Sequence, residues 1–187
     1  MGSMSAAIER PRKTVEDYLA LPDDVRAELI DGELYVTPSP VPDHQRVGLS
    51  LARLISPHVE AGGAGEVFIA PLDVHLPSGD IVQPDVLFVA TENAGIVQDW
   101  IRGVPDLLVE VLSPTGTERD RIVKHDLYAR NGVPEYWIAD PAARTIEVFR
   151  LDRAGAYRPA GYYLADAVLR SESLPGLELQ LADVFGR

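Results

Sequence analysis

The stretch "DLLVEVLS", residues 106–113, decides the fold, because it has the pattern of a core strand with a charged residue at its centre. Successive side chains of a strand point to opposite faces, so Glu110 shares one face with Leu108 and Leu112. Both faces are otherwise apolar, which predicts an internal strand and a buried Glu110. A buried carboxylate pairs with a cationic side chain, is protonated, or binds a hard divalent cation.

A second carboxylate begins another apolar run, "PDVLFVA" at residues 84–90. Pro84 is tolerated as the first residue of a strand, and alternation places Asp85 on the face of Leu87. Two carboxylates that lie close together in a core repel each other unless a positive charge lies between them. Asp85 and Glu110 together therefore favour a binding site for Mg²⁺ or Mn²⁺ over an isolated buried glutamate.

The segment 115–132, "TGTERDRIVKHDLYARNG", predicts a helix that ends at its final Asn-Gly pair. At 100° per residue, Lys124 projects between Leu127 and Tyr128 and so points toward the sheet. The alternative is a lysine that extends along the surface and pairs with Asp120, four residues earlier. An inward lysine is suited to orient a water molecule or to offset negative charge that develops on a phosphate.

The other segments predict short strands mixed with helices. Residues 27–38 predict a hairpin that turns at Asp31-Gly32, and residues 39–63 predict a long helix that Pro57 closes or kinks. Order and length predict an α/β (α+β) fold, with a central mixed sheet flanked by helices. We expect one domain over residues 14–187, after a disordered segment 1–13 that begins with a cloning remnant.

Composition restricts the possible functions. The net charge of −12 over 187 residues opposes indiscriminate coating of nucleic acid, although a local basic groove or a divalent cation still permits a nucleic-acid enzyme. The absence of cysteine excludes a disulfide scaffold, a thiolate metal site and a cysteine nucleophile. With no bilayer-spanning apolar run and no secretory signal, we expect a cytoplasmic protein with no membrane partner.

From about residue 14 to about residue 151 the chain resembles the Uma-type restriction endonucleases, a branch of the PD-(D/E)XK nuclease superfamily. The resemblance implies a restriction-endonuclease-like core, Mg²⁺ at the site and DNA as the substrate. The segments that carry it are "AELIDGELYVTPSPVPDHQ", "VQPDVLFV", "GVPDLLVEVLSPT", "GVPEYWIADP" and the pattern Asp120-x3-Lys124-x3-Tyr128.

The resemblance assigns roles to individual residues. Asp85 matches the motif aspartate and Glu110 the motif acidic residue, which implies that both bind the metal. The usual lysine of the superfamily stands two residues after that acid, where this chain has Leu112. Lys124 matches branches of the superfamily in which the lysine has moved to the following helix.

Four further residues are candidates for the site. The early acidic position of the family matches Glu28 or Glu33, and alternation allows either to reach the site, with Glu28 slightly favoured. His44, near the start of the long helix, is either a contact to metal or phosphate, as in similar nucleases, or a plain helix residue. Gln83 is expected to bond either a phosphate or a loop backbone.

The leading hypothesis is a Mg²⁺-dependent endonuclease that hydrolyses DNA phosphodiester bonds with a metal-activated water. Its catalytic residues are Asp85, Glu110 and Lys124. The alternative is a non-catalytic interaction or regulatory module with a nuclease fold, motivated by the acidic charge and the missing motif lysine. The apolar strands at 135–140 and 145–151 are candidates for a homodimer interface, although the sheet also needs these residues.

Overall fold

The computed structural model describes residues 11–22, 24–113 and 119–186, and only the backbone of residues 119 and 120. The predicted cloning remnant, most of the predicted disordered segment and the start of the 115–132 helix lie outside these residues. Lys13 belongs to the segment predicted to be disordered, but its backbone N–H donates to Gly32 O at 2.7 Å. The predicted pair of Lys124 with Asp120 involves a side chain outside the description.

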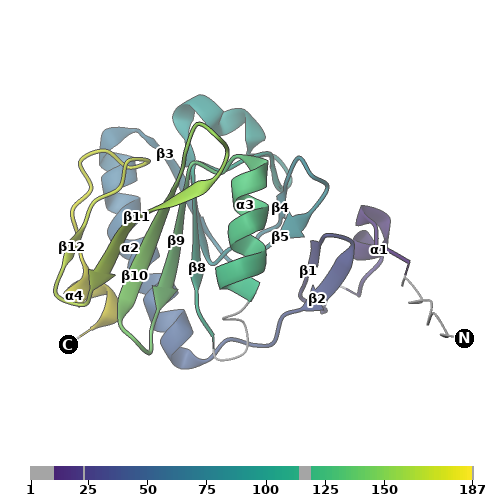
Figure 1. The fold of residues 1–187 in the computed structure, drawn as a ribbon, viewed down its shortest axis with the longest axis horizontal. Helices are drawn as coiled ribbons and strands as arrows, with labels where there is room; N and C mark the ends of the chain where they lie inside the picture. The colour runs from purple at the N-terminus through teal and green to yellow at the C-terminus, as the bar shows by residue number, and fades with distance from the viewer. Residues whose placement is uncertain (1–10, 23, 114–118, 187) are drawn as a thin grey trace, which may run out of the picture.

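A six-stranded mixed sheet forms the centre of the fold. Its order is β11-β10-β9-β8-β6-β3, and β8 pairs in parallel with β9 and antiparallel with β6 (Figure 1). The internal position of β8 is what the 106–113 pattern predicted, and the mixed sheet is what the order and length of the elements predicted. The strands are β3 (Gly65–Ile69), β6 (Val86–Ala90), β8 (Leu107–Val111), β9 (Glu135–Asp140), β10 (Thr145–Leu151) and β11 (Tyr157–Leu164).

Helices cover both faces of this sheet. Figure 1 shows α3 (His125–Asn131) in front of the sheet and α2 (Pro42–Gly62) behind it. Val109 packs in the core on the α2 side and Leu108 in the core on the α3 side, as strand alternation requires. The helix α3 follows a π-helical turn, η2 (Arg119–Lys124), and ends at Gly132, as predicted.

A second, five-stranded sheet was not predicted. Its order is β2-β1-β5-β4-β7, and its first two strands form the predicted hairpin, with Ile30 opposite Glu33. Asp31 and Gly32 both have positive φ, which the tight turn requires. The other three strands are two residues long, too short to show a period. The strands are β1 (Ala27–Ile30), β2 (Glu33–Val36), β4 (Val74–His75), β5 (Ile81–Val82) and β7 (Ile101–Arg102).

The helix α2 continues through Pro57 to Gly62, so Pro57 does not close it, and the alternative that Pro57 kinks the helix stays a prediction. Ile55 and Val59 are buried on either side of the proline, and their packing holds the last turn in place. The remaining elements are α1 (Val15–Leu19), η1 (Thr91–Ile96), β12 (Val168–Leu169), β13 (Leu179–Gln180) and α4 (Leu181–Phe185).

Two predictions concern partners of the protein, namely a homodimer and the absence of a membrane partner. The strand β9 is buried along five of its six residues, so most of it serves the sheet, and the homodimer stays a prediction. Across the described ranges, no helix combines the length and the apolar character that crossing a bilayer would require.

Candidate active site

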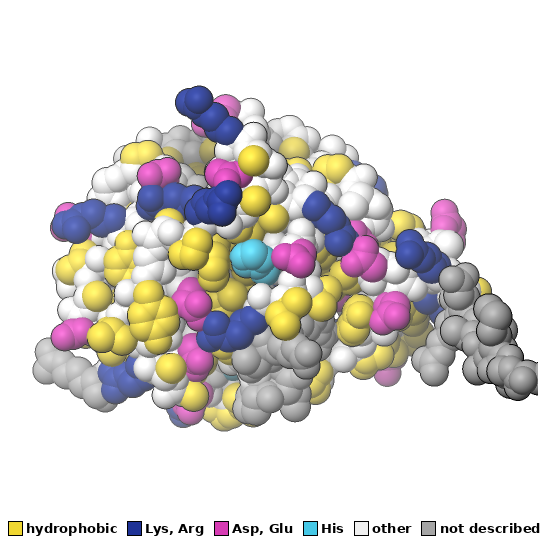
Figure 2. Space-filling view, viewed as in Figure 1, with side chains coloured by type: hydrophobic (Ala, Val, Ile, Leu, Met, Phe, Trp, Pro, Cys, Tyr) yellow, Lys and Arg dark blue, Asp and Glu magenta, His cyan; other side chains and the backbone are white. Residues whose placement is uncertain are grey.

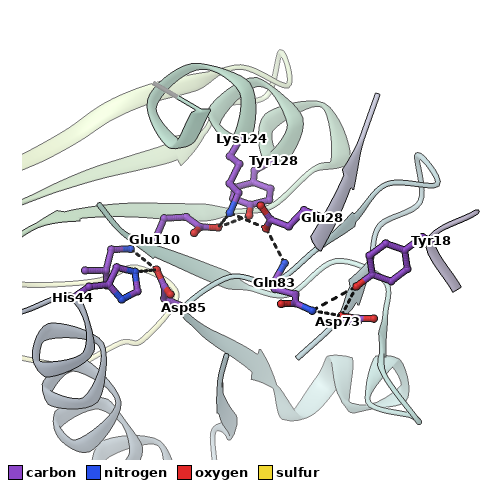
Figure 3. Close-up of polar contacts among 10 residues, drawn as sticks. Tyr18, Glu28, His44, Asp73, Gln83, Asp85, Glu110, Lys124 and Tyr128 are labelled. Carbon is purple, nitrogen blue, oxygen red and sulfur yellow. Dashed lines mark hydrogen bonds and ion pairs between the residues drawn. The ribbon is translucent and has the colours of Figure 1, made fainter. Parts of the chain in front are cut away.

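Lys124 lies at the centre of a buried polar cluster. Its Nζ is 2.8 Å from Glu110 Oε1 and 2.8 Å from Glu28 Oε1 (Figure 3). Lys124 is 4 % exposed and Glu110 is 3 % exposed, so the alternative of a lysine extended along the surface is wrong. Buried carboxylates need a positive partner, and one ammonium group contacts both of these.

Tyr128 holds the same carboxylate from one helical turn further on. Its hydroxyl donates to Glu110 Oε1 at 2.6 Å, and the ring is completely buried. Burial, and then the negative charges of Glu110 and Glu28, raise the pKa of Tyr128 well above its ordinary value. The hydroxyl therefore remains a donor, and it fixes one oxygen of Glu110 together with Lys124.

Asp85 lies directly before β6, opposite Glu110. The antiparallel register pairs Val86 with Val109, and one further step of this register pairs Asp85 with Glu110. The Val111 N–H donates to Asp85 Oδ2 at 2.7 Å, and His44 Nε2 is 3.1 Å from the same oxygen. The site is therefore built from the start of α2, which contributes His44, as well as from the strands.

Gln83 connects the site to the second sheet. Its backbone N–H donates to Glu28 Oε1 at 2.9 Å, which helps to fix that carboxylate. Its side-chain amide donates to Asp73 Oδ1 at 2.8 Å, and Tyr18 donates to the same oxygen at 2.9 Å. The amide nitrogen therefore bonds a carboxylate in place of the loop backbone, which was one of its two predicted partners, and a contact of Gln83 with phosphate stays a prediction. Sequence reasoning missed Tyr18 and Asp73, because no local pattern joins residues 55 positions apart.

The structure separates the two candidates for the early acidic position. Glu28 is buried and contacts Lys124, whereas Glu33 is exposed and accepts a hydrogen bond from Tyr35. Both glutamates belong to one hairpin, but Glu33 stands at its turn. Leu112 is buried in the core on the α3 side, so the usual lysine position of the superfamily contains packed hydrocarbon here.

A cavity of about 530 Å³ connects these side chains. Glu28 and Lys124 line it from one side and Asp85 and His44 from the other, with the loop 37–41 at its edge. The lining also includes Gln83 and Glu110. The candidates therefore share one concave space, with the exception of Glu33.

The donor set of this cavity fits a hydrated hard cation. Within the described ranges, no three histidine or carboxylate side chains form a ready metal-binding group. Mg²⁺ keeps several water ligands and is usually held by only one or two carboxylates. Asp85 and Glu110 supply such oxygens on adjacent strands, so a fully enclosed protein cage is not required.

The sequence matches the family Uma2, described as "Putative restriction endonuclease", over residues 15–182. The chain belongs to the Uma2 family. The match covers the hairpin, the central sheet and both covering helices, so the site lies entirely inside the region that the family shares.

Two related proteins were compared with the chain. "Uncharacterized protein slr1290" of Synechocystis sp. is 26 % identical over 160 residues, which is 83 % of each chain. A solved structure described as "a putative nuclease belonging to DUF820", from Anabaena variabilis, matches with a TM-score of 0.77 at 20 % identity. It covers 92 % of this chain, and the alignment includes 97 % of that protein. The chain therefore shares the fold of that protein, and its mixed α/β architecture is as predicted.

Proposed function

We propose that the protein is a Mg²⁺-dependent endonuclease that hydrolyses DNA phosphodiester bonds, with Mn²⁺ as an alternative cofactor. Asp85 and Glu110 hold the metal, and Lys124 assists the reaction. The observation that carries this proposal is the convergence of the two carboxylates and the buried lysine in one cavity. Membership of the Uma2 family supports it.

The chain prepares these groups for the reaction. The Val111 N–H and His44 orient Asp85, while Tyr128 and Lys124 orient Glu110. A bound Mg²⁺ supplies a water of lowered pKa and polarises phosphate oxygens. Lys124 provides a positive charge beside the phosphate and hydrogen bonds to an oxygen atom that gains negative charge. The buried surroundings strengthen these interactions, because water screens them less.

The surface makes a weak general contribution to DNA binding. Basic and acidic side chains are interspersed on the described part of the face in Figure 2, and the whole chain carries a charge of −12. Non-specific affinity for DNA comes mainly from lysine and arginine contacts to phosphates. Binding is therefore proposed to depend on the metal and on cationic groups inside the cavity.

The proposal is tested by nicking of supercoiled plasmid DNA in Mg²⁺ or Mn²⁺. The wild type is expected to convert plasmid to the open-circular form, and Glu110→Ala is expected to lose this activity. Calorimetric titration with the same metals should show binding that Asp85→Ala weakens. Equal behaviour of the wild type and Glu110→Ala on DNA contradicts the endonuclease assignment.

One observation favours the alternative of a non-catalytic module with a nuclease fold. Lys124 already contacts both Glu28 and Glu110, as a purely structural ion pair would. The titration separates the two functions. Absence of Mg²⁺ and Mn²⁺ binding at millimolar concentration favours the module, whereas saturable binding that depends on Asp85 favours the enzyme.

A further inference from the structure

Arg26 is a cavity residue without a role in the site described so far. It stands directly before β1 and lines the same cavity as Glu28 and Lys124. The Thr37 N–H donates to Arg26 O at 2.9 Å, which extends the hairpin ladder by one residue. Arg26 and Glu28 are two residues apart along the strand, so they share a face and lie about 7 Å apart.

The guanidinium of Arg26 has no counter-ion among the residues that the structure describes. No carboxylate of the described ranges forms an ion pair with it, and its Nε is buried without a hydrogen-bond partner. The half-buried position makes this unusual, because a buried donor without an acceptor is costly. The chain has 29 acidic residues against 17 basic ones, so acidic partners are not scarce.

Other arginines of the chain show the ordinary arrangement. Arg130 pairs with Asp31 at 2.6 Å, and Arg158 pairs with Asp152 at 2.8 Å. Arg153, in the turn between β10 and β11, is exposed to solvent. Arg26 differs from both kinds, because it pairs with no carboxylate that the structure describes and is not fully in solvent.

We propose that Arg26 binds a phosphate group of a nucleic-acid strand, next to the phosphate that reacts at Lys124. The nucleic-acid identity of this ligand rests on the proposed function. A guanidinium presents a planar set of N–H donors that fits phosphate in a bidentate manner. Arg26 and Lys124 line the same cavity, so both can contact one nucleic-acid strand.

The walls of the cavity fit this ligand. The hydroxyl-bearing residues Thr37 and Ser39 line it beside Arg26, on a loop whose backbone is restricted by Pro38 and Pro40. A volume of about 530 Å³ is that of a small-molecule site, so it accepts a nucleotide unit of one strand. Arg26 therefore provides the positive charge that the acidic surface lacks.

The test measures binding separately from cleavage. The probe is a fluorescein-labelled single-stranded oligonucleotide with phosphorothioate linkages, which resist hydrolysis, and its anisotropy is followed in Mg²⁺ at several salt concentrations. Arg26→Ala is expected to weaken binding about tenfold and to reduce the slope of log K against log salt by about 0.7. Arg26→Lys keeps the charge, so it is expected to keep the slope and lose part of the affinity.

Arg153→Ala is the matched control, since it removes an arginine outside the cavity, and its affinity and slope should equal those of the wild type. The proposal is overturned if Arg26→Ala binds like the wild type, if Arg153→Ala weakens binding equally, or if the wild type does not bind the probe. Binding that depends on Arg26 without plasmid nicking refutes the endonuclease alone. Nicking by a wild type whose binding is independent of Arg26 refutes the phosphate site alone.

Discussion

Two cavities of similar size contain an arginine and a buried carboxylate, but their arrangement differs. The first, of about 530 Å³, is the candidate active site, and the second, of about 430 Å³, lies beside the hairpin turn. In the second, Arg130 Nη2 lies 2.6 Å from Asp31 Oδ1 and 3.3 Å from Asp80 Oδ2. In the first, Arg26 has no such partner within the described ranges.

The polar side chains of the second cavity therefore have a structural role. Asp80 also accepts from the Asp31 N–H at 2.7 Å and from the Ser78 hydroxyl at 2.5 Å, which joins the hairpin turn to the loop before β5. In the first cavity the polar groups surround an open space, and Lys124 is shared by two carboxylates. The polar groups of the second cavity join two segments of the fold, whereas those of the first include a guanidinium that has no carboxylate partner within the described ranges, as expected at a ligand site.

The largest expected effect is on the unfolding free energy, when a cationic side chain is replaced by methionine in each of the two cavities. Lys124→Met leaves two buried carboxylates without their shared ammonium, which should cost about 3–5 kcal/mol of unfolding free energy. Arg130→Met removes a side chain that is 41 % exposed, and it should cost about 1 kcal/mol or less. Urea denaturation at neutral pH measures both.

Equal losses in the two variants contradict this contrast. They would mean that the second cavity is as strongly desolvated as the first, although Arg130 is partly in solvent. Metal ions should be removed with a chelator before the measurement, because a cation bound to Glu110 would offset part of the loss in Lys124→Met.

The second prediction concerns activity. Glu110→Gln keeps the shape of the side chain and removes its charge, so plasmid nicking should fall by more than about 100-fold, beyond the range typical of residues that only support a ligand. Asp80→Asn makes the same change in the second cavity and should leave nicking within about twofold at a temperature where both proteins are folded. Initial rates at saturating Mg²⁺ check this, and a similar loss in Asp80→Asn argues against a dedicated site.

Sequence reasoning predicted the features that depend on local geometry. Alternation along residues 107–111 placed Glu110 on the correct face, and the Asp31-Gly32 pair located the hairpin turn. The inward position of Lys124 followed from its spacing to Leu127 and Tyr128, although part of that segment is π-helical. Each of these features is determined by residues that lie only a few positions apart in the sequence.

Features that depend on how distant elements pack could not be predicted. The contact of Gln83 with Asp73 and Tyr18 joins two elements that have no common pattern in the sequence. In the second sheet, β5 pairs with the hairpin strand β1, β4 pairs with β5, and β7 pairs with β4, so each two-residue strand depends on a neighbour that is distant in the sequence. The lack of a counter-ion for Arg26 within the described ranges is a property of its surroundings, although alternation could have placed Arg26 on the face of Glu28.

The choice between Glu28 and Glu33 gives a third, smaller prediction. Glu28→Gln removes a carboxylate that contacts Lys124 and accepts from the Gln83 N–H, so nicking should fall about tenfold or more. Glu33→Gln changes an exposed residue that bonds Tyr35, and its activity should equal that of the wild type. Single-turnover rates separate the two. A loss confined to Glu33→Gln would place the early acid at the hairpin turn and not in the cavity.

The smallest effect concerns alkaline pH and asks how closely Tyr128 is coupled to the carboxylates of the first cavity. Its pKa is raised by burial and by Glu110, so unfolded chains ionise this tyrosine from about pH 10 while folded chains keep it protonated. Its contribution to stability is therefore complete below pH 10 and is lost as pH rises further. Above pH 10, the unfolding free energy of Tyr128→Phe should fall less steeply with pH than that of the wild type. The difference between the two slopes should correspond to at most one proton per molecule. Parallel curves for the two proteins, measured by thermal melts, would mean that the pKa of Tyr128 is the same in folded and unfolded chains.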